Sequence, residues 1–386
     1  FWSSGISRSE LAEQSGFSRS KANMATAALI ERGMLDETGP QVSSGGRRPE
    51  TLLLSSEMGV LAAIDLGASS VDVALIAPDM TVLAHHAENI EIAEGPGVVL
   101  SRVKDILRDL RKRCNVRAEK VIGIGIGVPG PVEFDSGLLV APPIMPGWEG
   151  FSIREYLRDE YAAPVFIDND VNVMAMGELW RLQRKLPNFL VVKVGTGIGC
   201  GIVCNGMIYR GTNGSAGDVG HICVDPAGER CHCGNQGCVE IMAAGPAIAR
   251  QGTEAANAGK SPQLAQVLAA NGVITPEDVG QASRGGDVAA NAIIKLSGKL
   301  IGQMLASVVN FFNPSHVFIA GGISQIGPMF LASIRQSIYQ RSLPLSTRHL
   351  EILYAPLGDR AGVIGCAAMA FQETMRVRGV LPGSES

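Results

Sequence analysis

The residues with the clearest chemical potential lie in the stretch GHICVDPAGERCHCGNQGCVE, residues 220–240. His221, Cys231, Cys233 and Cys238 have the residue types and the short spacing of a four-ligand zinc site. A disulfide between Cys231 and Cys233 is disfavoured because a single residue separates them. Four protein ligands leave no open coordination position, so we predict a structural zinc ion. Reduced thiols that merely share a loop are the alternative.

A second polar group follows a predicted buried strand, in the stretch PVFIDNDVNVMAMGELW. The strand is expected to end at Ile167, and Asp168, Asn169 and Asp170 come next, where α/β proteins place ligand chemistry. Asp170 could accept a proton from a hydroxyl group, and Asn169 could hold a neighbouring hydroxyl. Capping of the helix that follows is the alternative role.

Three glycine-rich turns after buried strands could bind a nucleotide. The turns DLGASS and GTGIGCG place small residues where backbone amides could hold phosphate, and the strand end VFIAGGIS could lie against a flat adenine ring. The residues expected to bind nucleotide, with Asp65 also able to hold a metal ion, are Asp65, Gly67, Ser69, Gly195, Thr196, Gly197, Gly321 and Gly322. Purely structural hairpins remain the alternative for each turn.

The elements that carry these turns repeat one plan. Residues 60–86 and residues 189–211 each read as a buried strand, a small-residue turn and a returning strand. This repetition predicts two related α/β lobes that face a cleft.

The N-terminal stretch ISRSELAEQSGFSRSKANMATAALIERGMLDE predicts two helices around a tight turn. Ser7 and Glu10 have capping-box spacing, and Ser18 is placed to cap a second helix that ends near Arg32. This spacing is typical of a helix-turn-helix with the second helix in the recognition position. A small helical hairpin for protein contacts is the alternative.

The next stretch, LDETGPQVSSGGRRPETLLLSS, predicts two extended segments that flank a glycine-rich tip, as in a DNA-binding wing. Positive and negative residues balance in residues 1–50, so the distribution of charge matters more than its sum. The residues placed to meet phosphates and groove edges of operator DNA are Arg19, Ser20, Lys21, Arg47 and Arg48.

The composition is that of a compact globular protein. The chain has 386 residues, 46% of them hydrophobic and 18% charged, which suggests two or three domains. The net charge of −4 gives no strong overall attraction to nucleic acid or membranes. We find no secretory segment and no apolar run of about 18 residues, and the eight cysteines do not suggest a disulfide framework. A cytoplasmic location is expected, and the absence of an initial Met suggests that the native start lies upstream.

Together these features resemble the ROK family of bacterial repressors and sugar kinases. The stretches GDVGHICVDPAGERCHCGNQGCVE, DNDVN, GTGIGCGIV and PLGDRAGVIGCAAMA carry the resemblance. It implies an α/β, actin-like (ribonuclease-H-like) two-lobed sugar-kinase fold with an N-terminal winged helix-turn-helix. The expected domains are the winged helix-turn-helix at 1–56, a first lobe at 57–170, a second lobe with the zinc site at 171–360, and a C-terminal helix returning to the first lobe, plus a tail, at 361–386.

The resemblance also implies roles for individual residues. Those expected to contact sugar are Gly130, Asn169, Asp170, Asp218, His221 and Glu240. If the protein is a kinase, Asp170 is the base that activates a sugar hydroxyl toward the γ-phosphate of ATP, with magnesium. Two positions depart from the family pattern. Asp218 replaces a usual Glu, and Ala68 and Ser69 replace Gly and Thr in the first phosphate turn.

The sequence therefore predicts a sugar-responsive repressor of carbohydrate metabolism genes. Its expected partners are operator DNA, a small-molecule sugar and further copies of itself in a dimer or tetramer, with no membrane. An ATP-dependent hexose or N-acetylhexosamine kinase with a DNA-binding arm is the alternative, because Asp170 and the second phosphate turn are both present.

Overall fold

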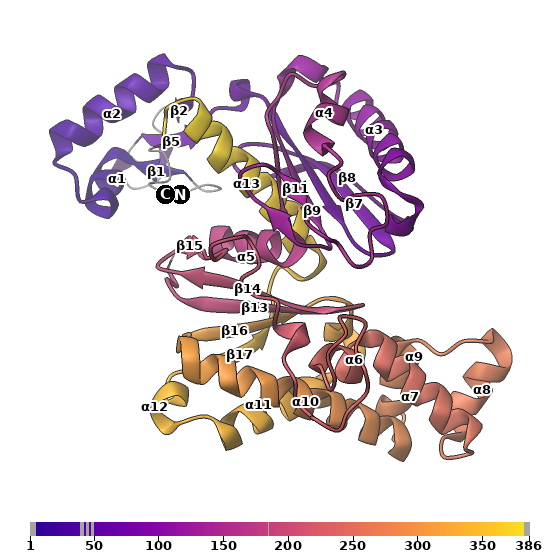
Figure 1. Ribbon diagram of the computed structural model, residues 1–386. Coiled ribbons are helices and arrows are strands. Elements are labelled where there is room, and N and C mark those ends of the chain that lie inside the picture. Colours follow the sequence, from indigo (N-terminus) through magenta and orange to yellow (C-terminus); the bar gives the residue numbers. More distant parts are fainter. Residues whose placement is uncertain (1–4, 39–41, 44–45, 48–49, 184, 382–386) are drawn as a thin grey trace. The chain divides into compact units, whose positions relative to one another are not determined.

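The structure is a computed structural model that describes residues 5–38, 42–43, 46–47, 50–183 and 185–381 (Figure 1). The chain divides into two compact units. The first comprises Phe1–Asp170 and Gly362–Ser386, and the second comprises Val171–Ala361.

Two helices lie at the beginning of the first unit. Helix α1 (Arg8–Ser15) starts with the predicted capping box, in which Ser7 and Glu10 bond each other's backbone and side-chain groups. Helix α2 (Arg19–Glu31) is capped by Ser18, whose side chain accepts a hydrogen bond from the backbone of Lys21. Both predicted helices are therefore confirmed, because local capping chemistry fixes their starts.

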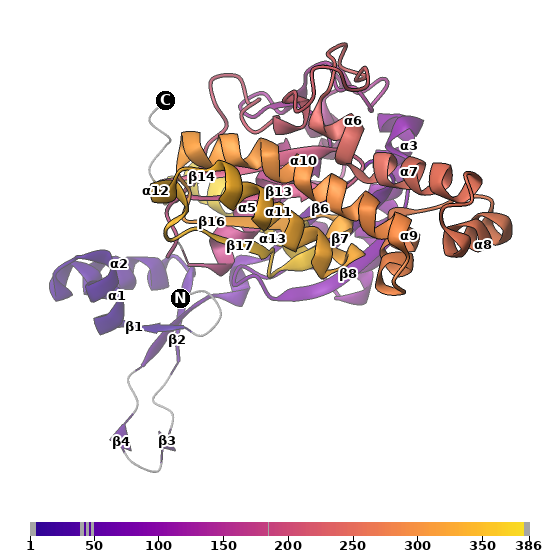
Figure 2. The same cartoon turned by 90° about the horizontal axis from the view of Figure 1, so that it is seen from below.

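A small antiparallel sheet accompanies these helices. Its strand order is β1 (Ile6–Ser7), β5 (Thr51–Leu54), β2 (Leu35–Thr38). Two further short strands, β3 (Val42–Ser43) and β4 (Gly46–Arg47), pair with each other in the segment between β2 and β5 (Figure 2). The two extended segments predicted to flank the glycine-rich tip correspond to β2 and β5, which pair antiparallel, and β3 and β4 lie between them.

Each unit also contains a five-stranded sheet, and the two sheets share one topology. The strand order is β12-β9-β6-β7-β8 in the first and β15-β14-β13-β16-β17 in the second. In both, three consecutive antiparallel strands are followed by two parallel ones, as the repeated hairpins predict. The strands are β6 (Val60–Leu66), β7 (Ser70–Ile76), β8 (Val82–Asn89), β9 (Val121–Val128), β12 (Val165–Asn169), β13 (Phe189–Val194), β14 (Ile198–Cys204), β15 (Met207–Ile208), β16 (His316–Ala320) and β17 (Glu351–Tyr354). A short pair, β10 (Val132–Glu133) and β11 (Leu138–Leu139), completes the first unit.

Helix α13 (Ala361–Val377) packs against the first sheet through a glycine. A Cβ atom on Gly125 of β9 would collide with the backbone carbonyl of Cys366 on α13. The Cys366 thiol donates a hydrogen bond to the carbonyl of Ile64, 3.2 Å away, on β6. The C-terminal helix thus belongs to the first unit although the second unit precedes it in the chain.

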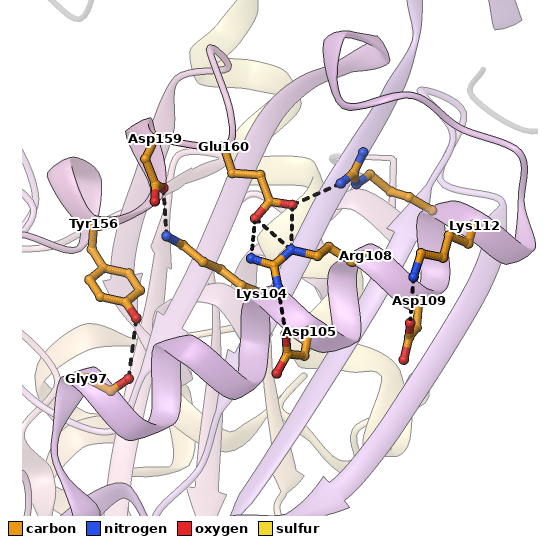
Figure 3. Close-up of polar contacts among 10 residues, drawn as sticks. Gly97, Lys104, Asp105, Arg108, Asp109, Lys112, Tyr156, Asp159 and Glu160 are labelled. Carbon is orange, nitrogen blue, oxygen red and sulfur yellow. Dashed lines mark hydrogen bonds and ion pairs between the residues drawn. The ribbon is translucent and has the colours of Figure 1, made fainter.

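Helix α3 (Pro96–Arg113) covers strands β7 and β8 and is fastened to the end of α4 (Ile153–Arg158) by charged side chains. The buried Lys104 ammonium lies 2.6 Å from an Asp159 carboxylate oxygen, and two arginines of α3 bond the carboxylate of Glu160 (Figure 3). A buried ammonium requires such a partner, so this network holds the C-terminal end of α4 against α3.

The second unit is built around helix α10 (Val288–Phe312), which lies beside α11 (Pro328–Arg341) in Figure 1. Gly298 and Gly302 let the two helices approach closely, because a Cβ atom on either would meet α11. The other helices are α5 (Asp170–Arg181), α6 (Val239–Ala243), α7 (Gly245–Asn257), α8 (Pro262–Asn271), α9 (Pro276–Arg284) and α12 (Pro344–Thr347).

Helix α10 is apolar along much of its length, although Asn291, Lys295 and Lys299 leave it without an uninterrupted apolar run of about 18 residues. By length and composition it is long and apolar enough to cross a membrane, with a mean hydropathy of 1.4 over an 18-residue window. The window is 61% buried inside the protein. A core helix covered on most sides is also apolar on most sides, which explains its composition.

Candidate functional site

The structure brings His221, Cys231, Cys233 and Cys238 together. Their ligand atoms all lie within 4.8 Å of one another. The Cys231 sulfur lies 3.6 Å from His221 Nδ1, and the Cys233 and Cys238 sulfurs are 3.7 Å apart. Tetrahedral zinc, with bonds of about 2.3 Å to sulfur and about 2.0 Å to nitrogen, separates its ligand atoms by about 3.5–3.8 Å. The four side chains therefore fit a zinc ion.

Backbone pairing folds this loop into position. The backbone N–H of Val224 donates to the carbonyl of Gly237, 2.8 Å away, and that of Val239 donates to Ile222, 3.0 Å away. Gly237 has φ 70°, and a Cβ atom there would collide with the carbonyl of Asp225. Only glycine tolerates both the positive φ and the close approach of this carbonyl. Gly237 therefore lets the segment that carries Cys238 run back beside the first part of the loop.

The environments of the three thiols differ. Cys231 and Cys238 are buried, whereas Cys233 is exposed. Burial raises the pKa of the Cys238 thiol to about 12, and a backbone hydrogen bond from Asn235 lowers the pKa of Cys233. A bound cation would oppose the burial effect by stabilising the thiolate form that zinc requires.

His221 presents its two ring nitrogens to different neighbours. Nδ1 faces the Cys231 sulfur, and Nε2 lies 3.8 Å from a carboxylate oxygen of Asp218. One nitrogen can therefore bind a metal while the other contacts a second group, which fixes the ring orientation. The sequence alone did not predict which nitrogen takes which role.

Glu240, on α6, joins the metal loop to the second glycine-rich turn. Its Oε2 atom accepts a hydrogen bond from the backbone N–H of Ile198, 2.9 Å away. A Cβ atom on Gly197 would lie 2.7 Å from the same oxygen, and one on Gly220 would lie 3.1 Å away. These two glycines therefore make room for the carboxylate, a contact that the sequence did not reveal.

The two nucleotide motifs of the second unit meet at one edge of its sheet. Strands β13 and β16 are parallel, with Lys193 opposite Ala320, so the turn at 195–197 and the glycines at 321–322 leave the sheet side by side. The predicted residues brought together here are Gly195, Thr196, Gly197, Gly321 and Gly322. The Gly195 amide already donates to the Gly197 carbonyl, 2.9 Å away, so it is not directed at a ligand.

The first glycine-rich turn, between β6 and β7, is held by backbone bonds. The Gly67 amide donates to the Ser70 carbonyl at 2.8 Å, and the Ala68 carbonyl accepts from Ile92 at 3.0 Å. The Ser69 carbonyl accepts a further backbone bond, from residue 90 at 3.2 Å. Gly67 and Ser69, which were predicted to bind nucleotide, therefore lie in a turn that backbone hydrogen bonds hold in place.

Asp65, the third predicted nucleotide residue of the first unit, lies on β6 next to α13. A Cβ atom on Gly362 would collide with the Asp65 carboxylate, so the glycine at the start of α13 makes space for it. This acidic group is half-buried.

The predicted catalytic carboxylate lies where β12 meets α5. The strand does not end at Ile167 as expected, because Asp168 and Asn169 continue the parallel pairing with β9. Asp170 is the first residue of α5 and is 9% exposed. The Asn169 amide donates to the carbonyl of Gly130, 3.1 Å away, so these predicted sugar residues of the first unit are neighbours.

The predicted DNA-binding residues are only partly described. Arg19, Ser20 and Lys21 are exposed in the first turn of α2, and the Lys21 ammonium lies 4.1 Å from the ring centroid of Phe17. Arg47 is on β4, and Arg48 lies outside the described residues.

Known proteins resemble this chain along most of its length. The family model for the ROK family matches residues 61–373. The xylose repressor of Caldicellulosiruptor bescii is 32% identical over 372 residues, covering 96% of this chain and 92% of that protein. The glucokinase of Halalkalibacterium halodurans is 34% identical, covering 78% of this chain and 92% of that protein.

A solved structure extends the similarity to three dimensions. The crystal structure of a ROK family transcriptional regulator, a homologue of the E. coli MLC protein, matches with a TM-score of 0.81 and 28% identity. The match covers 98% of this chain and 95% of that one. These findings confirm the fold class predicted from the sequence.

Proposed function

The chain belongs to the ROK family, and from this membership we propose that it is a sugar-responsive transcriptional repressor of carbohydrate metabolism genes. One observation carries the proposal. The family model begins at residue 61, after α1, α2 and the small sheet, yet the similarity to a xylose repressor covers 96% of this chain. The similarity to a glucokinase covers only 78%. The N-terminal helices are thus shared with a repressor.

The N-terminal elements supply DNA binding. Helix α2 follows α1 in the position of a recognition helix, and Arg19 and Lys21 extend from its first turn into solvent. These cations, with the predicted wing residues Arg47 and Arg48, contact phosphates or groove edges. One winged helix per chain favours a homodimer or larger symmetric oligomer, whose half-sites lie one or more helical turns apart. Operator binding places the protein in the cytoplasm.

We propose two groups of polar residues for sugar binding. One group is Asn169 and Asp170 with the Gly130 backbone, and the other is Asp218, His221 and Glu240. The hydrogen bonds to Gly130 and Ile198 hold Asn169 and Glu240 in fixed positions before the ligand arrives. Preorganised polar groups of this kind lower the entropic cost of binding.

The metal site has a structural role in this proposal. Zinc, when bound by His221, Cys231, Cys233 and Cys238, cross-links the loop and leaves no position for catalysis. The chain's own residues then position the sugar-binding side chains, because the Nε2 atom of His221 lies toward Asp218 and the last metal ligand, Cys238, is two residues before Glu240.

Thermal unfolding in the presence of a sugar panel tests whether a sugar is the ligand. A sugar that binds only the folded state raises the melting temperature. We expect one class among hexoses, N-acetylhexosamines and pentoses to do so. No shift with any sugar at millimolar concentration would contradict the proposal.

An ATP-dependent sugar kinase is the second possibility, favoured by Asp170 at the start of α5 and by the tight turn at 195–197. In that case Asp170 takes the proton of the attacking hydroxyl. The first turn argues against efficient turnover, because Ala68 adds a Cβ atom where phosphate would approach. Magnesium-dependent ADP release at about 1–100 per second with one sugar, abolished by Asp170→Asn, would establish the kinase.

A further inference from the structure

The outward face of helix α2 is apolar in the middle. Ala22 and Thr26 are the buried residues of the helix, and the Thr26 hydroxyl donates to the Ala22 carbonyl at 2.7 Å. An α-helix advances about 100° per residue, so Met24 points away from that buried side. Its side chain is 70% exposed. The methionine thioether is only a weak hydrogen-bond acceptor, so hydration does little to favour an exposed position for this side chain.

Neighbours of Met24 extend the same face. Ser20 and Ala27 lie four residues before it and three residues after it, so all three follow one stripe along the helix, and all are exposed. Glu31 closes the stripe at the C-terminal end of α2. The stripe therefore offers a hydroxyl, then two apolar groups, then an acidic group that phosphates would repel.

Two cations flank the N-terminal half of this stripe. Lys21 lies on one side of it and Arg19 on the other, where Arg19 lines a hollow of about 390 Å³ that also contains Arg8 and the acidic Glu50. Arg8 is also paired with Glu37, at 2.7 Å. An apolar stripe flanked by cations suits a polyanion with apolar groups on its surface better than it suits an uncharged protein surface.

We propose that Met24 and Ala27 read the 5-methyl groups of thymine bases in the major groove of operator DNA, while Arg19 and Lys21 contact the adjacent phosphates. This inference rests on the proposed function and adds the kind of base that the protein recognises. The thymine methyl is the apolar group that base edges present in the major groove, and apolar side chains contact it. The stripe carries no arginine or lysine that could read guanine from its centre.

Thymine replacement by deoxyuridine tests this directly, because it removes the 5-methyl group and nothing else. Duplexes that bind the full chain are first selected from a random pool, and binding is then measured by fluorescence anisotropy at one fixed salt concentration. We expect one or two thymines per half-site at which deoxyuridine weakens binding about fourfold, equivalent to about 0.8 kcal/mol per buried methyl.

Variants identify the side chain that senses the methyl. Met24→Ala should bind the thymine duplex more weakly than wild type and should no longer distinguish thymine from deoxyuridine at that position, and Met24→Leu should restore the distinction. Met207→Ala is the matched control, because Met207 is a similarly exposed methionine on β15 and is 59% exposed. This control should keep the full response to deoxyuridine.

The outcomes separate this inference from the function on which it rests. If selected duplexes bind equally well with thymine and deoxyuridine at every position, or if Met24→Ala keeps the wild-type response, methyl recognition is wrong and DNA binding stands. If Met24→Ala instead changes the sedimentation of the free protein, the stripe is a protein contact and the inference is overturned. If the pool yields no bound duplex, the proposed function fails as well.

Discussion

At the scale of single residues, Cys233 offers the cleanest test of the metal site, because its side chain is exposed while Cys231 and Cys238 are buried. We expect freshly purified protein to contain about one zinc per chain. Cys233→Ser should lose the metal, because serine does not replace a thiolate ligand of zinc. It should also lower the melting temperature, because a structural metal contributes folding free energy.

Elemental analysis measures the zinc, and Cys223→Ser is the matched control. Cys223 is an exposed cysteine opposite Cys238 in the antiparallel bridge, but it is not one of the four clustered ligands. The control should keep its zinc. Wild-type protein without zinc, or equal loss from both variants, would show that this cluster is not the metal site.

Residue spacing predicted the cluster but not its fine geometry. The four ligands lie within one short loop, so their types and separations are visible in the sequence. The hydrogen bond from the Ile198 backbone N–H to the Glu240 carboxylate joins residues 42 positions apart, and it depends on how α6 packs against β14. Which His221 nitrogen faces the sulfurs depends likewise on the folded loop, so neither feature could be read from the pattern.

At the scale of elements, the contact of α13 with the first sheet depends on a glycine. Gly125→Ala would push a methyl group into the Cys366 carbonyl. Relieving this clash requires the backbones of β9 and α13 to move apart, which costs packing free energy. We expect the free energy of unfolding to fall by about 1–3 kcal/mol. Urea unfolding measures the change.

Gly97→Ala on α3 is the control for this substitution, because a Cβ atom there would meet nothing within 4 Å. It should leave stability unchanged or slightly raised, since alanine favours helix more than glycine does. If Gly125→Ala were as stable as Gly97→Ala, the packing of α13 against β9 described above would be wrong.

Elements defined by local chemistry were the most predictable. Ser7 and Glu10 marked the start of α1, and the two repeated hairpins indicated two sheets of one topology. The end of β12 was wrong by two residues, because strand length there is set by pairing with β9 rather than by Asp168 and Asn169 themselves. Helix α10 was not predicted, and its apolar composition is explained by burial against α11 and other neighbours, which only the folded structure shows.

At the scale of the whole molecule, DNA binding and sugar binding should be separable. Deleting residues 1–56 should abolish binding to selected duplexes, because α1, α2 and the wing are then absent. The zinc content and the sugar-induced rise in melting temperature should stay as in the full chain, since their residues lie elsewhere. A truncated protein that still retards operator DNA in a gel would contradict the claim that residues 1–56 are needed for DNA binding.

The central claim is that sugar binding lowers the affinity for DNA. The fold-loss of DNA affinity cannot exceed the ratio of the sugar's affinities for the two states of the protein, the one with low and the one with high DNA affinity. Glu240→Gln is an informative variant, because glutamine can still accept the Ile198 hydrogen bond but loses the charge. Loss of one charged hydrogen bond to a sugar hydroxyl should weaken sugar binding by about tenfold to a hundredfold.

The most direct measurement is fluorescence anisotropy of a labelled operator duplex bound to the protein, followed during titration with the sugar that raises the melting temperature. The account predicts that wild-type protein releases the duplex as the sugar saturates. It predicts that Glu240→Gln binds the duplex with wild-type affinity and releases it only at about tenfold or higher sugar concentration. A sugar that saturates the wild-type protein and leaves its affinity for the duplex unchanged would contradict the account.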